Sequence, residues 1–176
     1  MKRSKKLVRN LSIIAIILSV FFYFDGYYLS KQRCVMETLR GIYSTETGKE
    51  VMELRYGNYI ATVMAEENGE SFSVIGTNQK GFMYRTGDCS TGIKIDKEKS
   101  MTISGMGSEK YMVIFIHRND KSIDKVEVIT ENGETYTIAE WHEDYAGYIR
   151  ENHNWECATY KAYNAEGELV GEEIYY

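Results

Sequence analysis

The chain has 176 residues, of which 43% are hydrophobic, and a formal net charge of −5. This length is enough for one domain with a single buried core. Five of the 21 basic residues and one of the 26 acidic residues precede Ser30, so the remainder holds 16 basic and 25 acidic residues and a net charge of −9. A surface of this sign repels nucleic-acid phosphates and anionic lipid headgroups. The composition therefore disfavours nucleic acid as a partner and predicts that the part after Ser30 projects from a membrane rather than lying on it.

The first 28 residues have the order of a membrane-targeting segment. An uninterrupted apolar run, Leu11–Phe24, follows a basic end and precedes a polar remainder, which is typical of such segments. The basic residues before it are Lys2, Arg3, Lys5, Lys6 and Arg9. The run is shorter than the roughly 20 residues that a spanning helix needs. Leu7 and Val8 can extend it at one end, and residues 27–29 at the other.

Retention in the membrane and cleavage are the two alternatives for this segment. Cleavage by a signal peptidase requires small residues before the cut, whereas residues 21–28 are mostly bulky aromatics. We therefore expect an uncleaved signal anchor, with residues 11–28 in the lipid bilayer of the cell membrane. The protein is then single-pass, with a cytoplasmic N-terminus and an extracytoplasmic C-terminal domain. If the segment is cleaved, the domain is secreted.

A short amphipathic helix is predicted directly after this segment. Its apolar residues recur at three- and four-residue steps, with charged residues between them, from Ser30 to Ile42. They are Val35, Met36, Leu39 and Ile42. We expect this apolar stripe to pack on the sheet that follows, with the helix either separate from the membrane helix or continuous with it.

From Glu50 onward the hydrophobic period changes to two, which predicts β-strands. Strands are expected at 50–56, 58–66, 71–76, 82–86, 93–95, 101–104, 111–116, 123–130, 135–141, 157–163 and 169–176. Residues 68–69 and 132–133 are both Asn-Gly, the pair that favours tight hairpin turns. Turns are also expected at 78–81, a loop at 87–92, and a short helix or aromatic loop at 142–156. The most apolar stretch after the anchor, 111–116, is predicted to be the central strand.

These elements predict a mainly β protein. After the transmembrane or signal-anchor helix and the short amphipathic helix, we expect an antiparallel β-sandwich or a strongly bent β-sheet. Three segments follow from this: a basic end and anchor at 1–29, an amphipathic helix and linker at 30–48, and a β-rich extracytoplasmic domain at 49–176.

Three cysteines allow one disulfide with one thiol left over. Cys89 and Cys157 both fall in the β-rich part, which makes them the candidate pair, with Cys34 remaining. Unpaired, buried thiols are an equal alternative. No Cys-x-x-Cys occurs, so the sequence gives no support for a thioredoxin-like or zinc-ribbon site.

No catalytic, cofactor-binding or metal-ligating residues are assigned. His117 follows the predicted central strand and is interpreted as structural. His142 and His153 lie near Glu143 and Asp144, but their spacing is not the four-residue step of a helical zinc site. The chain is therefore not expected to be an enzyme.

An aromatic cluster is the candidate recognition surface, because exposed aromatic rings bind sugars and peptides by stacking and desolvation. Its members are Trp141, Tyr145, Tyr148 and Trp155. A protein or a glycan of the envelope would be the partner. The alternative is that these rings cap one end of the sheet.

Two short motifs carry a family resemblance. They are the strand Gly81-Phe-Met-Tyr-Arg-Thr-Gly87 and the late turn Ala162-Tyr-Asn-Ala-Glu-Gly167. Together with the basic anchor, they make the chain resemble small uncharacterised exported or membrane-anchored β-rich proteins of low-GC Gram-positive bacteria. The resemblance implies a location and a fold, and no activity. Tyr84-Arg85 stands where a tryptophan is often found in that group.

Three functions remain open. The first is a membrane-anchored extracytoplasmic protein that acts as a binding or accessory envelope module. The second is an immunity or inhibitor protein whose acidic domain neutralises a cationic toxin or enzyme, since charge complementarity speeds such encounters. The third, the least favoured, is an extracytoplasmic hydrolase or metal-dependent enzyme.

Overall fold

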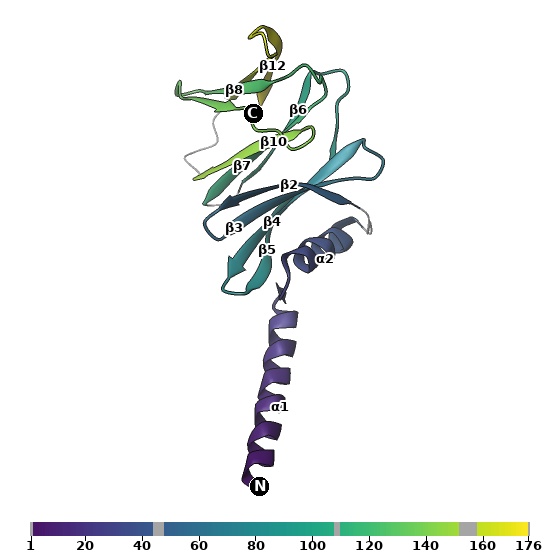
Figure 1. Ribbon diagram of the computed structural model, residues 1–176, viewed down its shortest axis with the longest axis vertical. Coiled ribbons are helices and arrows are strands. Elements are labelled where there is room, and N and C mark those ends of the chain that lie inside the picture. The colour runs from purple at the N-terminus through teal and green to yellow at the C-terminus, as the bar shows by residue number, and fades with distance from the viewer. Residues whose placement is uncertain (1, 44–47, 108–109, 152–157, 176) are drawn as a thin grey trace.

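The computed structural model describes residues 2–43, 48–107, 110–151 and 158–175. Within them it contains two helices and twelve strands (Figure 1). The helices are α1 (Lys2–Phe24) and α2 (Lys31–Tyr43). The strands are β1 (Tyr27–Tyr28), β2 (Lys49–Tyr56), β3 (Tyr59–Ala65), β4 (Ser71–Lys80), β5 (Met83–Lys94), β6 (Met101–Gly107), β7 (Tyr111–Arg118), β8 (Lys125–Thr130), β9 (Thr135–Ile138), β10 (Tyr145–Glu151), β11 (Ala158–Tyr163) and β12 (Leu169–Tyr175).

The strands form three antiparallel sheets. Sheet A has the order β1-β5-β4-β3-β2, sheet B the order β10-β7-β6, and sheet C the order β12-β11-β8-β9. Sheets A and B also approach each other at two places, where β2 lies beside β10 and β5 lies beside β6. Sheet A is next to α1, sheet B lies above it, and sheet C is at the far end of the molecule (Figure 1). The mainly β, antiparallel character of the prediction is confirmed.

Strand β7 is the centre of the fold because both of its faces are buried. Val113 and Phe115 belong to the core shared with sheet A, whereas Ile114 and Ile116 belong to the core shared with sheet C. This follows from the two-residue period of a strand, which sends successive side chains to opposite faces. All four are fully buried. The prediction that 111–116 is the central strand is confirmed.

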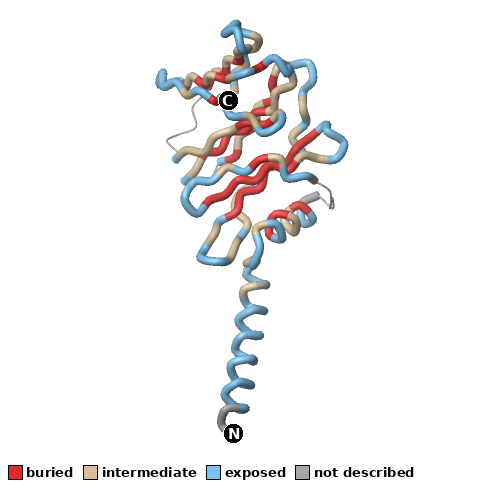
Figure 2. Tube along the Cα trace, viewed as in Figure 1, coloured by how far each residue is buried: buried red, intermediate tan, exposed pale blue. Residues whose placement is uncertain are grey.

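Helix α2 covers the outer face of sheet A. Val35 and Leu39 pack against Met64 of β3 and Ile75 of β4, so the predicted apolar stripe meets the sheet as expected. Strands β3 and β4 are therefore buried on both faces over most of their length, as Figure 2 shows by their colour. The layers run in the order α2, sheet A, sheet B and sheet C.

Two predicted breaks in sheet A are wrong. The loop expected at 87–92 is part of β5, which runs for 12 residues, and the turn expected at 78–81 narrows to Gly81 and Phe82. Strand β5 pairs with β4 along this length, with register shifts between Phe72 and Val74 and between Ile75 and Thr77. Bulges of this kind absorb glycine and polar residues that read as loop in the sequence.

The short helix or aromatic loop expected at 142–156 is also wrong over residues 145–151. Residues 145–151 form β10, which pairs with β7 from Tyr145 opposite His117 to Glu151 opposite Tyr111. The spacing of the apolar residues resembled a helix because both faces of β10 are covered, so apolar residues occur on each of them. Tyr145 packs into the core with sheet A, and Tyr148 into the core with sheet C.

Candidate functional site

From Leu7 onward, α1 exposes a largely apolar surface. Its large side chains are exposed along the length of the helix, ending with Phe24, which is 83% exposed. They are Leu7, Val8, Leu11, Ile13, Ile14, Ile16, Ile17, Leu18, Val20, Phe21 and Phe24. Figure 2 shows the helix standing away from the folded domain. Apolar surface of this extent is rarely left in water and marks a site of contact with another phase or molecule.

Among the residues that the structure describes, no helix combines the length and the apolar character needed to cross a bilayer.

Helix α1 joins the domain without a linker. The helix ends at Phe24, and Gly26 follows with a φ of +76°, the left-handed conformation that terminates helices. The Asp25 amide donates to the Phe21 carbonyl at 3.0 Å. Strand β1 follows at once and pairs with β5, with Tyr27 opposite Arg85 and Tyr28 opposite Tyr84. This pairing fixes the end of α1 to sheet A. The helices are therefore separate, and the alternative of one continuous helix is wrong.

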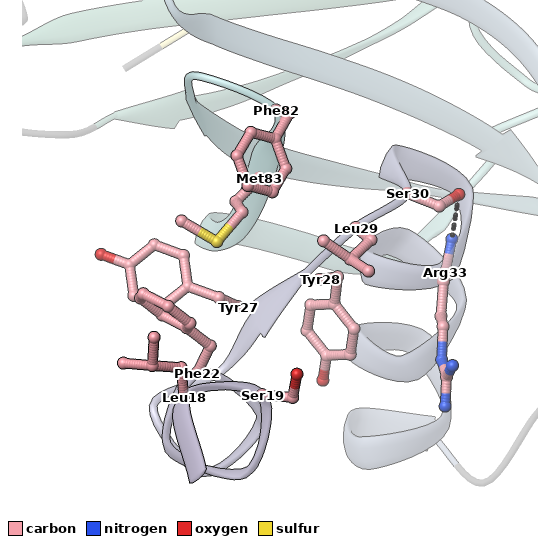
Figure 3. Close-up of a pocket in the computed structure, with 10 residues that line it drawn as sticks. All are labelled: Leu18, Ser19, Phe22, Tyr27, Tyr28, Leu29, Ser30, Arg33, Phe82 and Met83. Carbon is pink, nitrogen blue, oxygen red and sulfur yellow. Dashed lines mark hydrogen bonds between the residues drawn. The ribbon is translucent and has the colours of Figure 1, made fainter. Parts of the chain in front are cut away.

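A hollow of about 530 Å³ lies where α1, β1, α2 and the β4–β5 hairpin meet (Figure 3). Phe22 of α1 meets Tyr27 edge-to-face at 5.8 Å between ring centroids, and the Arg85 guanidinium lies 5.6 Å from the Tyr27 centroid. The residues that line the hollow are Leu18, Ser19, Phe22, Tyr27, Tyr28, Leu29, Ser30, Arg33, Phe82 and Met83. We call the part of this lining outside α1, together with Arg85, the collar. It is mostly apolar, with Arg33 at its rim.

The collar is held in place by contacts between α2 and sheet A. Lys31 Nζ forms ion pairs with Glu50 at 2.7 Å and with Glu53 at 2.6 Å. Burial alone would lower the pKa of Lys31, but the hydrogen bonds to these two carboxylates outweigh it, so the pKa is raised. On the same helix, Cys34 Sγ lies 3.5 Å from Thr86 Oγ1 of β5. These contacts fix α2 against β2 and β5.

Charge is divided unevenly between the two ends of the domain. Residues 30–95, which contain α2 and sheet A strands β2–β5, have eight basic and eight acidic residues. Residues 96–176, which contain sheets B and C, have eight basic and 17 acidic residues. The entire net charge of −9 therefore belongs to the part that lies farther from α1 in Figure 1.

The candidate recognition surface is not assembled from its three described members. Tyr145 is 6% exposed and lies in the core with sheet A, while Tyr148 faces the opposite side of β10 and stacks on Tyr136. Trp141 is held by a hydrogen bond from Nε1 to the Asp124 carbonyl at 2.7 Å. Trp155 lies outside the described residues. The three rings serve the packing of the sheets.

The polar cluster after β7 is a structural network. Arg118 stacks on Trp141, with 4.9 Å from its guanidinium to the ring centroid, and donates to the carbonyls of Ile123 and Glu143. Its Nε also pairs with Asp144 at 3.3 Å. Burial alone would raise the pKa of Asp144, but hydrogen bonds from Lys121 and Arg118 outweigh it and lower the pKa. The network ties β7 to the loop before β10.

His117 lies beside this network, against the core. Its ring is 4.8 Å from Tyr145 between centroids, and its Nδ1 lies 2.7 Å from Asn119 Oδ1. Burial lowers the pKa of His117, although the bond to Asn119 acts in the other direction. His142 forms an isolated bridge with Tyr145, and His153 is outside the described residues. Within the described ranges, no three His, Cys, Asp or Glu side chains are grouped to hold a metal ion.

The cysteines differ in their surroundings. Cys34 is buried and Cys89 is exposed, and the structure shows each of them as a free thiol. Cys157 lies outside the described residues, so the predicted Cys89–Cys157 disulfide has only one described partner, whose thiol is free. Burial raises the pKa of both described thiols, and the Asp88 charge adds to the effect at Cys89. A raised pKa favours the protonated thiol, which is the less reactive form.

Comparisons of the chain with family models, with curated proteins and with solved structures found no match. The resemblance to exported proteins of Gram-positive bacteria therefore stays a prediction, and the site must be interpreted from its geometry.

The collar was missed in the sequence. Phe82 reads there as the start of a strand, and Leu29 as an extension of the membrane segment. The available signal was the sequence Gly81-Phe82, because a glycine in a tight turn places its neighbour at a hairpin tip.

Proposed function

We propose that the protein is a single-pass membrane protein in which α1 anchors an extracytoplasmic β-rich binding module. The observation that carries this proposal is the apolar surface of α1, whose large side chains are exposed from Leu7 to Phe24. The basic residues at the start of the chain support a cytoplasmic N-terminus. Under this proposal the domain begins at the extracytoplasmic surface of the membrane, since only Asp25 and Gly26 separate α1 from β1.

The length of the apolar segment is compatible with a helix that spans a locally thinned bilayer. The run Leu11–Phe24 alone would be about 21 Å long at 1.5 Å per residue, against a hydrocarbon core of about 30 Å. Counting from Leu7 brings the length to about 27 Å, provided that Arg9 extends its side chain towards the lipid phosphates. Local thinning of the bilayer can accommodate the small remaining mismatch.

The division of charge supports a binding role. A neutral half next to the membrane and an acidic half away from it would present the negative charge to molecules arriving from outside. A cationic protein is the partner that this surface attracts, and salt weakens such an association. The narrower alternative, an immunity or inhibitor protein directed against a cationic toxin or enzyme, is supported by the same observation.

The anchoring proposal is tested by placing a charge in α1. We expect the double substitution Ile14→Asp/Ile17→Asp to release most of the protein from membranes during alkaline extraction, whereas the natural protein stays in the pellet. Each central carboxylate disfavours insertion by about 2.5–3.5 kcal/mol. The measurement is the pelleted fraction on an immunoblot.

Ile174→Asp is the matched control, because Ile174 is also an exposed isoleucine but lies in β12. This variant should remain in the pellet. Complete extraction of the natural protein under the same conditions would contradict the proposal.

A further inference from the structure

The tip of the β4–β5 hairpin carries an exposed aromatic residue where polar residues are usual. Gly81 has a φ of +62° and turns the chain, and Phe82 beside it is 72% exposed. Leu29, in the segment between β1 and α2, is 76% exposed. Neither side chain serves the three cores of the domain. Their exposure therefore calls for a contact outside the domain.

The position of this hairpin is tied to the end of α1. Because β1 pairs with β5, Phe82 and Met83 lie across the hollow from Leu18 and Phe22 of α1 (Figure 3). The hollow is thus walled on one side by the proposed membrane helix and on the other by the hairpin. Any phase that surrounds the last turns of α1 also reaches Phe82.

Basic side chains surround this apolar surface. Arg33 lines the hollow, Arg85 lies over Tyr27, and Lys80 directly precedes the turn at the hairpin tip. An aromatic and aliphatic centre with cations at its rim is the pattern of surfaces that enter the headgroup layer. Of the 25 acidic residues after Ser30, which would oppose such contact, 17 lie at 96–176, in the half of the domain away from the collar.

We propose that the collar is a second membrane-contact surface, which docks the domain on an anionic phospholipid bilayer. Phe82 and Leu29 enter the headgroup layer, acyl chains fill the hollow, and Arg33, Arg85 and Lys80 meet the phosphates. The domain then rests on the membrane in one orientation, with its acidic half outward, instead of projecting on a free tether. This inference rests on the proposed anchoring by α1.

The test places a tryptophan at the hairpin tip of the full-length protein. The F82W variant is reconstituted into vesicles of phosphatidylcholine and phosphatidylglycerol that carry bromine on their acyl chains near the headgroups. Brominated lipid quenches tryptophan fluorescence on contact. We expect F82W to add a quenched component to the background of Trp141 and Trp155, relative to vesicles without bromine.

L169W is the matched control, since Leu169 is an exposed apolar residue at the start of β12, in sheet C. Its added fluorescence should be unquenched. Equal, unquenched signals from both variants would overturn the inference. Flotation of the same vesicles separates this failure from failure of the anchor: a protein that does not float contradicts the proposed anchoring, whereas a floating protein with unquenched F82W contradicts only the docking.

The charge contribution is tested by removing phosphatidylglycerol. We expect quenching of F82W to be weaker in vesicles of brominated phosphatidylcholine alone, and the Arg33→Gln/Arg85→Gln double variant to lose this dependence on lipid charge. If F82W with both arginines intact is quenched equally in the two vesicle types, the proposed contact between the basic residues of the collar and the lipid phosphates is overturned.

Discussion

Replacing Phe115 with alanine is expected to lower the free energy of unfolding by about 3–5 kcal/mol. Phe115 lies in the central strand β7, is fully buried, and packs in the core between sheets A and B with Val63, Phe72 and Tyr145. Truncation of this side chain removes contacts to both sheets and leaves a cavity. The cavity cannot close, because hydrogen bonds to neighbouring strands hold β7 in place on both sides. Urea unfolding of the full-length protein in detergent micelles, followed by tryptophan fluorescence, measures the change.

Phe82→Ala is the control for this substitution. The side chain is the same, but Phe82 is exposed at the hairpin tip, so the free energy of unfolding should change by no more than about 0.5 kcal/mol. Similar losses for the two variants would contradict the assignment of Phe115 to the centre of the fold.

The second large effect is expected at Gly147, in the middle of β10. A Cβ atom at this position would lie 2.4 Å from the Ile114 carbonyl oxygen of β7 and 3.1 Å from Leu54 Cδ1. The carbonyl belongs to the backbone of the central strand and cannot move without separating β10 from β7. We expect Gly147→Ala to lower the free energy of unfolding by about 1–3 kcal/mol, which the same urea titration measures.

Replacing a glycine that has open surroundings is expected to raise the free energy of unfolding instead of lowering it. Gly41 lies in α2, and an added Cβ would have no heavy atom within 4 Å. Gly41→Ala should raise the free energy of unfolding by about 0.5–1 kcal/mol, because alanine favours the helix. A neutral result at Gly147 would show that β10 does not pack as closely on β7 as described.

Local patterns in the sequence predicted the elements whose environment is simple. The stripe of Val35 and Leu39 indicated α2, and the apolar stretch at 111–116 indicated the central strand, because in each case the burial of side chains follows directly from the period of the element. The Asn-Gly turn at 68–69 was likewise predicted, and Gly69 has the positive φ that such turns require.

The two strands that were predicted wrongly, β5 and β10, owe their conformation to contacts with neighbouring strands. Strand β5 contains Gly87 and Gly92, and these glycines indicate a loop when the sequence is considered alone. In the structure β5 is a strand because it pairs with β4 along its length. Strand β10 has cores on both sides, so the side to which Tyr145 or Tyr148 points could not be read from spacing. For the same reason the aromatic cluster was interpreted as a surface.

The collar depends on contacts between distant segments. Its residues come from the segment at 27–33 and from residues 82–85 at the start of β5, which meet each other and the end of α1 only because β1 pairs with β5. The sequence did show the two features that meet at the collar. They are an apolar segment with aromatic residues at its C-terminal end and a Gly-Phe pair in the β-rich part. Their proximity is a property of the sheet and could not be predicted from either segment alone.

Protease treatment of intact cells tests the central claim, that the domain after α1 is held outside the membrane. With an epitope tag at the C-terminus, we predict that external protease removes the tag signal from intact cells while a cytoplasmic control protein stays whole. A tag that survives until the membrane is permeabilised would place the domain on the cytoplasmic side and contradict the account.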